Sequence, residues 1–166
     1  MSSKAAAVSA TLFRNACARF ATGVTVVTVV DENSHPHGMT VNSFSSVSLD
    51  PPLVLCSIDL RNAILGHFQT SLFFGINILE ESQEFISRRF SSPSENRFEG
   101  VDWHLGKSGV PLIAGALAHV ECAVTRSFEE GDHAVLIGRA IHADYSKDGR
   151  PLLYFGSGYQ RLTNGE

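Results

Sequence analysis

The stretch that decides the fold is residues 38–52, which read GMTVNSFSSVSLDPP. We predict one strand over residues 39–49, ended by the Asp-Pro-Pro turn, and alternation would place Thr40, Asn42 and Phe44 on one of its faces. Buried hydroxyl and amide groups cost roughly 1–3 kcal/mol each when they have no hydrogen-bond partner. Two partners remain open for this polar face: a polar ligand, or water at the edge of a sheet.

Apolar and β-branched segments surround this polar strand on both sides in the chain. Further strands are expected over residues 24–30, 53–58, 72–79, 120–124 and 133–143, and residues 151–159 are expected to form a closing segment. Helices are expected over residues 9–20, with Gly23 as C-cap, over 62–68, with Asn62 as the capping residue, and after Glu80, with Phe85, Ile86 and Phe90 inside. Short strands with few helices predict a mainly β fold, a barrel or sandwich with a few peripheral helices, and not a doubly wound parallel sheet.

The composition predicts one globular domain over residues 1–166, with residues 1–8 flexible. Hydrophobic residues make up 43% of the chain and charged residues 18%, a balance that favours a buried subunit interface. The net charge is −4 and no basic run is present, which argues against nucleic-acid or membrane partners. The three cysteines lack CxxC spacing, so a disulfide framework is not expected and a reducing cytoplasm is the expected compartment.

Common nucleotide and catalytic motifs are missing from the chain. GxGxxG, the Walker loop, HExxH and GxSxG do not occur. The segment His35-Pro36-His37 offers two imidazoles, but no Cys or carboxylate is grouped beside them at ligand spacing. We interpret this segment as a solvated turn and expect no metal site.

Several segments in a fixed order resemble the flavin reductase-like family. These are FATGVTVVT at 20–28, GMTVNSF at 38–44, VSLDPPLV at 47–54, GDH at 131–133 and PLLY at 151–154. The resemblance extends from about residue 12 to residue 162. The family comprises small NAD(P)H:flavin oxidoreductases that supply reduced flavin to two-component monooxygenases.

The resemblance implies a split β-barrel of the Greek-key, FMN-binding type, usually dimeric. FMN or FAD would bind against residues 39–46, NADH or NADPH would donate the hydride, and a partner oxygenase would receive reduced flavin by diffusion. In that setting Thr40 and Asn42 would hydrogen-bond the flavin ring, and Ser43 and Ser46 would reach the ribityl chain or phosphate. The cofactor-binding residues expected in this region are Met39, Thr40, Val41, Asn42, Ser43 and Ser46.

A second segment, residues 56–63, would hold the ribityl phosphate at a junction of strand and helix. The expected cofactor-binding residues there are Cys56, Ser57, Ile58, Asp59, Asn62 and Ala63, with Arg61 as a nearby charge. The expected pocket is completed from two further segments: Arg89 and Phe90 in the following helix, and Phe155 and Tyr159 near the C-terminus. The alternative roles, without ligand contact, are core packing for Cys56, helix capping for Asn62 and a solvated position for Arg89.

His133 and Asp132 are the expected catalytic pair, because the resemblance places this histidine near the dimethylbenzene side of the flavin or near the nicotinamide. Asp132 would orient the imidazole, whereas a simple turn role is the alternative. Residues 91–109 form a long polar stretch with Phe98 and Trp103, which is expected to act as a lid, to reach over a partner subunit as an arm, or to be disordered. Two other functions stay open: a flavin-binding module without NADH chemistry, and a reductase of a metal or corrinoid.

Overall fold

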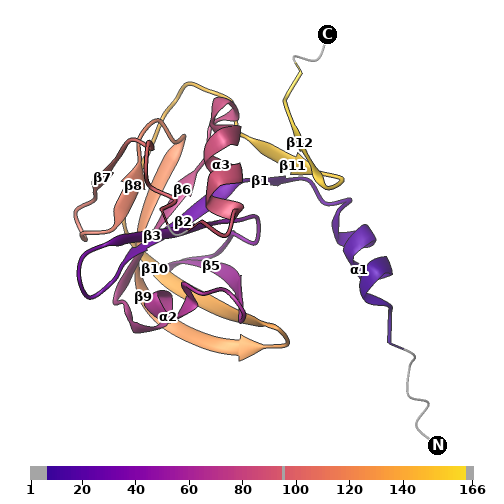
Figure 1. Cartoon of the computed structure of the whole chain (residues 1–166), viewed down its shortest axis with the longest axis horizontal. Coiled ribbons are helices and arrows are strands. Elements are labelled where there is room, and N and C mark those ends of the chain that lie inside the picture. Colours follow the sequence, from indigo (N-terminus) through magenta and orange to yellow (C-terminus); the bar gives the residue numbers. More distant parts are fainter. Residues whose placement is uncertain (1–6, 95, 164–166) are drawn as a thin grey trace, which may run out of the picture.

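Seven antiparallel strands form the central sheet of the protein in a computed structural model that describes residues 7–94 and 96–163. Their order across the sheet is β3-β2-β6-β9-β10-β5-β4 (Figure 1). The strands are β2 (Thr25–Val30), β3 (Pro36–Val41), β4 (Ser45–Leu49), β5 (Pro52–Asp59), β6 (Phe73–Ile78), β9 (Ala118–Glu130) and β10 (His133–Tyr145). The predicted mainly β class is therefore confirmed.

Consecutive strands β3 and β4 lie at opposite edges of this sheet. Residues 42–44 connect them, and Ser43 in this connection bonds to β5, the neighbour of the edge strand β4: its Oγ donates to the Ser57 carbonyl oxygen at 3.1 Å and accepts from the Ser57 N–H at 2.9 Å. The sheet therefore curls until its edges approach without a continuous ladder, as in a split barrel. The single strand predicted over 39–49 is wrong, because the chain must cross between edges at this point.

Two small sheets flank the main one. β1 (Thr22–Gly23), β11 (Leu153–Phe155) and β12 (Gly158–Gln160) form the first, and β7 (Trp103–Leu105) pairs with β8 (Pro111–Ile113) in the second. The segment predicted as a lid or arm, residues 91–109, contains β7. Within it, Phe98 packs edge-on against Phe90, with ring centroids 4.9 Å apart, so part of this segment covers its own core.

The helices are short and begin or end away from their predicted limits. α1 (Ala10–Cys17) ends before Gly23, which lies in β1 and is not a C-cap. α2 (Leu65–Thr70) starts three residues after Asn62, whose Oδ1 instead accepts from the Ile64 N–H in a turn. The third helical segment is a 3₁₀ turn, η1 (Glu81–Gln83), followed by α3 (Glu84–Ser91).

The core consists of two apolar clusters on the two sides of β2. One fills the barrel around Val27, Phe68 and Phe74, and the other lies beneath α3 around Val26, Leu79 and Phe90. On α3, Ile86 and Phe90 are buried as predicted, but Phe85 is exposed, because it faces away from the sheet. No helix in the described residues combines the length and apolar character that crossing a bilayer requires.

Candidate functional site

A cavity of about 200 Å³ opens where β3 ends, β5 ends and β10 begins; we call it the strand-end cavity. The antiparallel register opposes His133 to Asp59 and Val135 to Ser57, which brings residues distant in the chain to one place. The lining residues are Met39, Thr40, Val41, Asn42, Ser43, Ser57, Asp59 and His133. All eight are residues that the sequence predicted for cofactor binding or catalysis.

Two carboxylates organise the mouth of the strand-end cavity. Asp59 accepts from Arg61 at two atoms, with Nε–Oδ1 at 3.0 Å and Nη2–Oδ2 at 2.7 Å, and these bonds lower the pKa of Asp59. The Nδ1 of His133 lies 2.6 Å from Oδ1 of Asp132, a contact that lowers the pKa of this aspartate. Asp132 thus orients the imidazole ring of His133 through Nδ1. The other ring nitrogen, Nε2, is left for contacts with a ligand.

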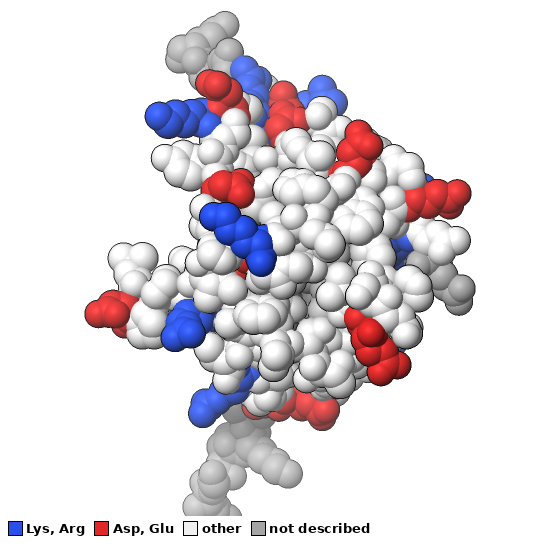
Figure 2. All heavy atoms as spheres, turned by 90° about the vertical axis from the view of Figure 1, so that its left-hand side faces the viewer, with Lys and Arg blue, Asp and Glu red and all other residues white. Residues whose placement is uncertain are grey.

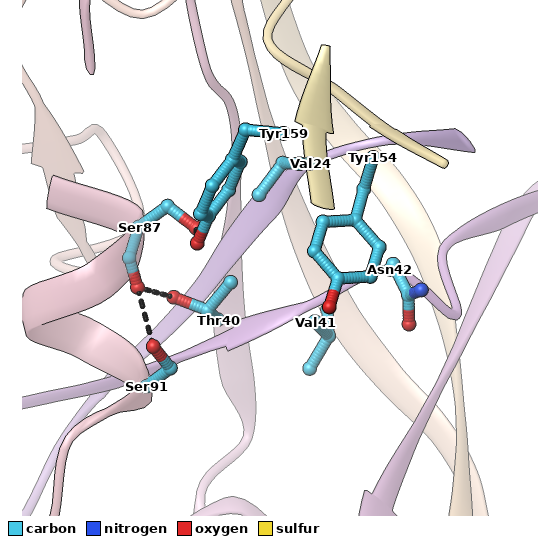
Figure 3. A pocket seen from close by; sticks show the side chains of 8 residues that line it. All are labelled: Val24, Thr40, Val41, Asn42, Ser87, Ser91, Tyr154 and Tyr159. Atoms are coloured by element: carbon cyan, nitrogen blue, oxygen red, sulfur yellow. Dashed lines mark hydrogen bonds between the residues drawn. The ribbon is translucent and has the colours of Figure 1, made fainter. Parts of the chain in front are cut away.

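A second cavity of about 250 Å³, the tyrosine cavity, shares Thr40, Val41 and Asn42 with the first. Figure 3 shows Tyr154 and Tyr159 directed toward β3 from the C-terminal strands, opposite Ser87 and Ser91 of α3. The remaining lining residue is Val24. The two cavities form one trough along the end of β3, with polar groups on both walls.

Hydrogen bonds inside the tyrosine cavity hold its walls together. The Thr40 Oγ1 donates to the Ser87 carbonyl oxygen at 2.7 Å, and Ser91 Oγ donates to the same oxygen at 2.9 Å (Figure 3). The hydroxyls of Ser87 and Tyr159 lie 2.8 Å apart. These contacts join α3 to β3 and to the C-terminal hairpin, so the cavity has a preformed shape.

The polar groups in the trough that have no hydrogen-bond partner among the described residues include the side-chain amide of Asn42 and the hydroxyl of Tyr154. An amide that supplies both donors and an acceptor matches the edge of a flavin ring, which presents carbonyl oxygens and a ring N–H. The residues present therefore fit a flavin at this place.

Three of the predicted cofactor residues have side chains in the core. Cys56, Ile58 and Phe90 are each at most 1% exposed, so only their backbone can face a ligand. Burial raises the pKa of the Cys56 thiol to about 12, which removes it as a nucleophile at neutral pH.

Four other predicted residues lie outside the strand-end cavity. Asn62 and Ala63 line a neighbouring cavity, and Ser46 is exposed on β4. Arg89 donates from Nε to the Arg97 carbonyl oxygen at 2.8 Å and from Nη2 to that of Asn96 at 3.0 Å, so it holds the following loop. Ser43 uses its hydroxyl to join β3 and β5, as described above.

Sequence reasoning missed Ser87, Ser91, Tyr154 and Arg97, all of which line cavities beside the predicted residues. On a helix with apolar Ile86 and Phe90, Ser87 carries no signal that separates it from a core serine. Only the packing of α3 on β3 and of the C-terminal hairpin on both brings Ser87, Ser91 and Tyr154 to the trough, while Arg97 lines the cavity that contains Asn62 and Ala63.

The two histidines of residues 35–37 share one carboxylate. His35 Nδ1 and His37 Nε2 lie 3.3 Å and 3.2 Å from Oδ2 of Asp31. Hydrogen bonds from the backbone of His35 and Asn33 and from both rings hold the pKa of Asp31 below its usual value, against the opposing effect of desolvation. Within residues 7–94 and 96–163, no group of three or more His, Cys, Asp or Glu is placed to hold a metal ion.

Comparison with known proteins shows which proteins are similar to this chain in sequence and in structure. The chain is 41% identical over 151 residues to the FMN reductase (NADH) SmoA of Agrobacterium fabrum, covering 91% of the chain and 85% of that protein. A Streptomyces globisporus NADH:FAD oxidoreductase, solved in complex with NAD and FAD fragments, superimposes with a TM-score of 0.87 at 41% identity, covering 92% of each chain.

The styrene monooxygenase flavin reductase of Pseudomonas putida S12 superimposes with a TM-score of 0.84 at 34% identity, covering 93% of this chain and 99% of that one. The family model described as flavin reductase like domain matches residues 17–163, nearly the whole described chain. This agreement of sequence, fold and trough shows that the chain belongs to the flavin reductase-like family.

Proposed function

We propose that the protein oxidises NADH and reduces FMN or FAD. The observation that carries the proposal is the trough at the end of β3, where the amide of Asn42, which has no hydrogen-bond partner within residues 7–94 and 96–163, lies in one cavity with His133. Family membership supports this function, and so do the relatives named as NADH-dependent reductases of FMN or FAD. The chemistry supplied by the substrates is hydride transfer from the reduced nicotinamide to the flavin ring.

The residues of the chain bind and orient the two substrates. Thr40 and Asn42 hydrogen-bond the flavin ring, Ser57 and Asn62 approach the ribityl phosphate, and His133, held by Asp132, contacts the nicotinamide. Hydride transfer needs no protein acid or base, but it needs the two rings held face to face within about 3–3.5 Å. The preformed walls of the trough, joined by Ser87, serve this positioning.

The test is NADH oxidation in air by the purified protein with added FMN, FAD or riboflavin. Turnover that depends on added flavin supports the proposal. Tight flavin binding without NADH oxidation would identify a flavin-binding module instead. Turnover only with a metal or corrinoid acceptor would identify a reductase of that acceptor.

We propose further that reduced flavin leaves by diffusion for a partner oxygenase. The styrene monooxygenase flavin reductase among the relatives supports this step. Coupling of this protein to a flavin-dependent oxygenase across a dialysis membrane tests it, because a diffusing flavin crosses the membrane and a protein contact does not. Product formed only when the two proteins share a compartment would contradict diffusion.

A homodimer is part of the same proposal. α1 extends from the body of the molecule (Figure 1), and none of its residues is buried. Two of these exposed residues are large and apolar: Leu12 and Phe13 are each about 60% exposed. On the face drawn in Figure 2, charged side chains are scattered and broad uncharged surface lies between them. A second copy would cover such surface, and sedimentation at micromolar concentration measures whether it does.

We also propose a cytoplasmic location, supported by the free thiols of Cys17, Cys56 and Cys122. Cell fractionation with antibody detection tests it. Recovery of the protein outside the cytoplasmic fraction would contradict the location without affecting the proposed reaction.

A further inference from the structure

The outer face of β5, β10 and β9 carries apolar side chains that the helices leave uncovered. Alternation along β5 and β10 buries Val54, Cys56 and Leu136 inside the barrel and turns their neighbours outward. α2 packs against β2, and α3 packs against β2 and β3, so no helix of the described residues has an extensive contact with β5 or β10. We call this surface the outer sheet face, and its apolar members are Leu53, Leu55, Phe128, Val135 and Ile137.

The register of the strands divides the outer sheet face into four rows that run across it. The first row consists of Asp59, His133 and Glu130. The fourth row contains Leu53 and Arg139, six residues further along β10. The two rows between them contain Ser57, Val135, Phe128, Leu55, Ile137 and Arg126. Carboxylates therefore lie at one end of the face, arginines lie toward the other, and apolar side chains occupy the middle.

Two of the charged side chains at the ends of this face have no counterpart in the chain itself. Glu130 and Arg139 are exposed and form no hydrogen bond or ion pair with the described residues. Six residues of β10 separate their rows, a distance of about 20 Å at about 3.3 Å per residue. Glu130 and Arg139 are therefore too far apart to pair within one copy of the protein.

A second copy of the chain complements the outer sheet face when the two faces pack with two-fold symmetry. If the symmetry axis runs along the strands, the carboxylates of the first row meet those of the second copy, and like charges repel. If the axis runs across the strands, the first row of each copy meets the fourth row of the other, and the apolar rows meet in the centre. The charges therefore favour the second arrangement, in which the two β10 strands cross antiparallel.

The outer sheet face also reaches the strand-end cavity. Ser57, Asp59 and His133 line that cavity and belong to the first two rows. NADH and flavin nucleotides carry negatively charged phosphates, whereas Asp59 and Asp132 place carboxylates at the mouth of the cavity. An arginine from the second copy would bring positive charge to this mouth.

We propose that the outer sheet face is the centre of a two-fold interface between two copies, and that Arg139 of each copy lies at the mouth of the strand-end cavity of the other. α1, proposed above as a dimer contact, adds to this interface. The interface follows from the surface of the chain alone. The effect of Arg139 on the reaction rests on the proposed function.

Sedimentation of charge-reversal variants tests the interface. Arg139→Glu and Glu130→Arg should each raise the dimer dissociation constant about tenfold or more, because each variant places like charges face to face. The double variant restores opposite charges and should return to within about threefold of the unmodified protein. Since the two residues cannot meet within one copy, this rescue requires the antiparallel contact. Lys147→Glu makes the same charge change at an exposed position after β10 and is the matched control, which should leave the constant unchanged.

Mixed dimers test whether Arg139 acts on the site of the other copy. Arg139→Met should lower kcat/KM for NADH about fivefold at protein concentrations where the variant is dimeric. After subunit exchange with His133→Ala, one site of each mixed dimer carries both substitutions and the other site carries neither. The mixture should therefore be about twofold more active than the mean of the two variants measured separately.

An unchanged dimer constant in Arg139→Glu would overturn the interface, and so would failure of the double variant to recover while its thermal unfolding midpoint is retained. A mixture no more active than the mean of its components would show that Arg139 does not act across the interface. If the unmodified protein oxidises no NADH with any flavin, the proposed function is rejected, whereas the sedimentation experiment still decides the interface.

Discussion

At the scale of single residues, Asn42 is the side chain whose ligand role is most directly testable. Its amide has no partner among the described residues, so Asn42→Ala removes no protein hydrogen bond. We expect the flavin Kd to rise about tenfold, equivalent to the roughly 1.5 kcal/mol of a strong hydrogen bond, while the thermal midpoint changes little. Flavin titration and thermal unfolding measure the two effects.

Asn33→Ala is the matched control for this experiment, because Asn33 is an exposed asparagine in the turn after β2. It should change neither flavin affinity nor stability appreciably. A large loss of stability in Asn42→Ala with unchanged flavin affinity would make Asn42 a structural residue and place the flavin elsewhere.

A substitution of His133 distinguishes a role in binding the nicotinamide from a role in binding the flavin. If Nε2 contacts the nicotinamide, His133→Ala should lower kcat/KM for NADH roughly 5- to 30-fold, a loss of about 1–2 kcal/mol, and leave the flavin Kd within about threefold. Steady-state NADH oxidation at saturating flavin measures the first quantity. A large rise in flavin Kd with unchanged KM for NADH would assign His133 to the flavin, and a loss of several orders of magnitude would indicate obligatory proton transfer.

At the scale of elements, Glu121 of β9 holds the turn between β7 and β8. Its carboxylate accepts from the N–H groups of Lys107, at 3.1 Å, and of Ser108 and from the Ser108 hydroxyl. Gly106 is required beside it, because a Cβ there would lie 2.6 Å from the Glu121 carboxyl carbon. The polar turn thus depends on one buried acid.

Glu121→Gln should destabilise the protein by about 1–3 kcal/mol, because one carboxamide oxygen cannot replace both carboxylate acceptors. At this chain length such a loss lowers Tm by roughly 2–10 °C. Glu129→Gln, an exposed position on the same strand, is the control. Calorimetry at pH 7 measures both, and equal midpoints for the two variants would contradict the role of Glu121.

The effect of Glu121 has a definite pH dependence. Burial alone would raise the pKa of its carboxyl, but the hydrogen bonds from Ser108 and Lys107 lower it overall. A lowered folded-state pKa means that the stabilisation is complete above the unfolded value, about 4.3, and is lost as the pH falls through the folded value. The difference in Tm between the unmodified protein and Glu121→Gln should therefore shrink below about pH 4.3 and be constant above pH 6.

At the scale of the whole molecule, the exposed side chains of α1 predict where two copies meet. The double substitution of Leu12→Ser and Phe13→Ser should weaken the dimer at least tenfold, because burial of each side chain contributes roughly 1.5–3 kcal/mol. Neither residue packs in the core, so the monomer should keep its Tm at low concentration. Arg14→Ser on the same helix is the control, and analytical ultracentrifugation is the measurement. An unchanged dimer constant would place the interface on another surface.

The sequence by itself determined the mainly β class and most of the segments that form the central strands, and the family resemblance named the residues that line the strand-end cavity. Alternation and β-branched runs are local properties, which is why β2, β5 and β6 lie close to their predicted limits. The order of the motifs was enough to indicate the family. Local pattern was less reliable for the helices, because α2 begins only after the turn made by Asn62.

Only the tertiary structure decided that β3 and β4 are separate strands at opposite edges, with their connection bonded to β5 through Ser43 and Ser57. It also decided that Cys56 faces the core, that Ser87 and Tyr154 face the trough, and that Arg97 lines the cavity that also contains Asn62 and Ala63. The physical reason is that these positions depend on the curl of the sheet and on contacts between segments far apart in the chain. No periodicity within a single segment carries that information.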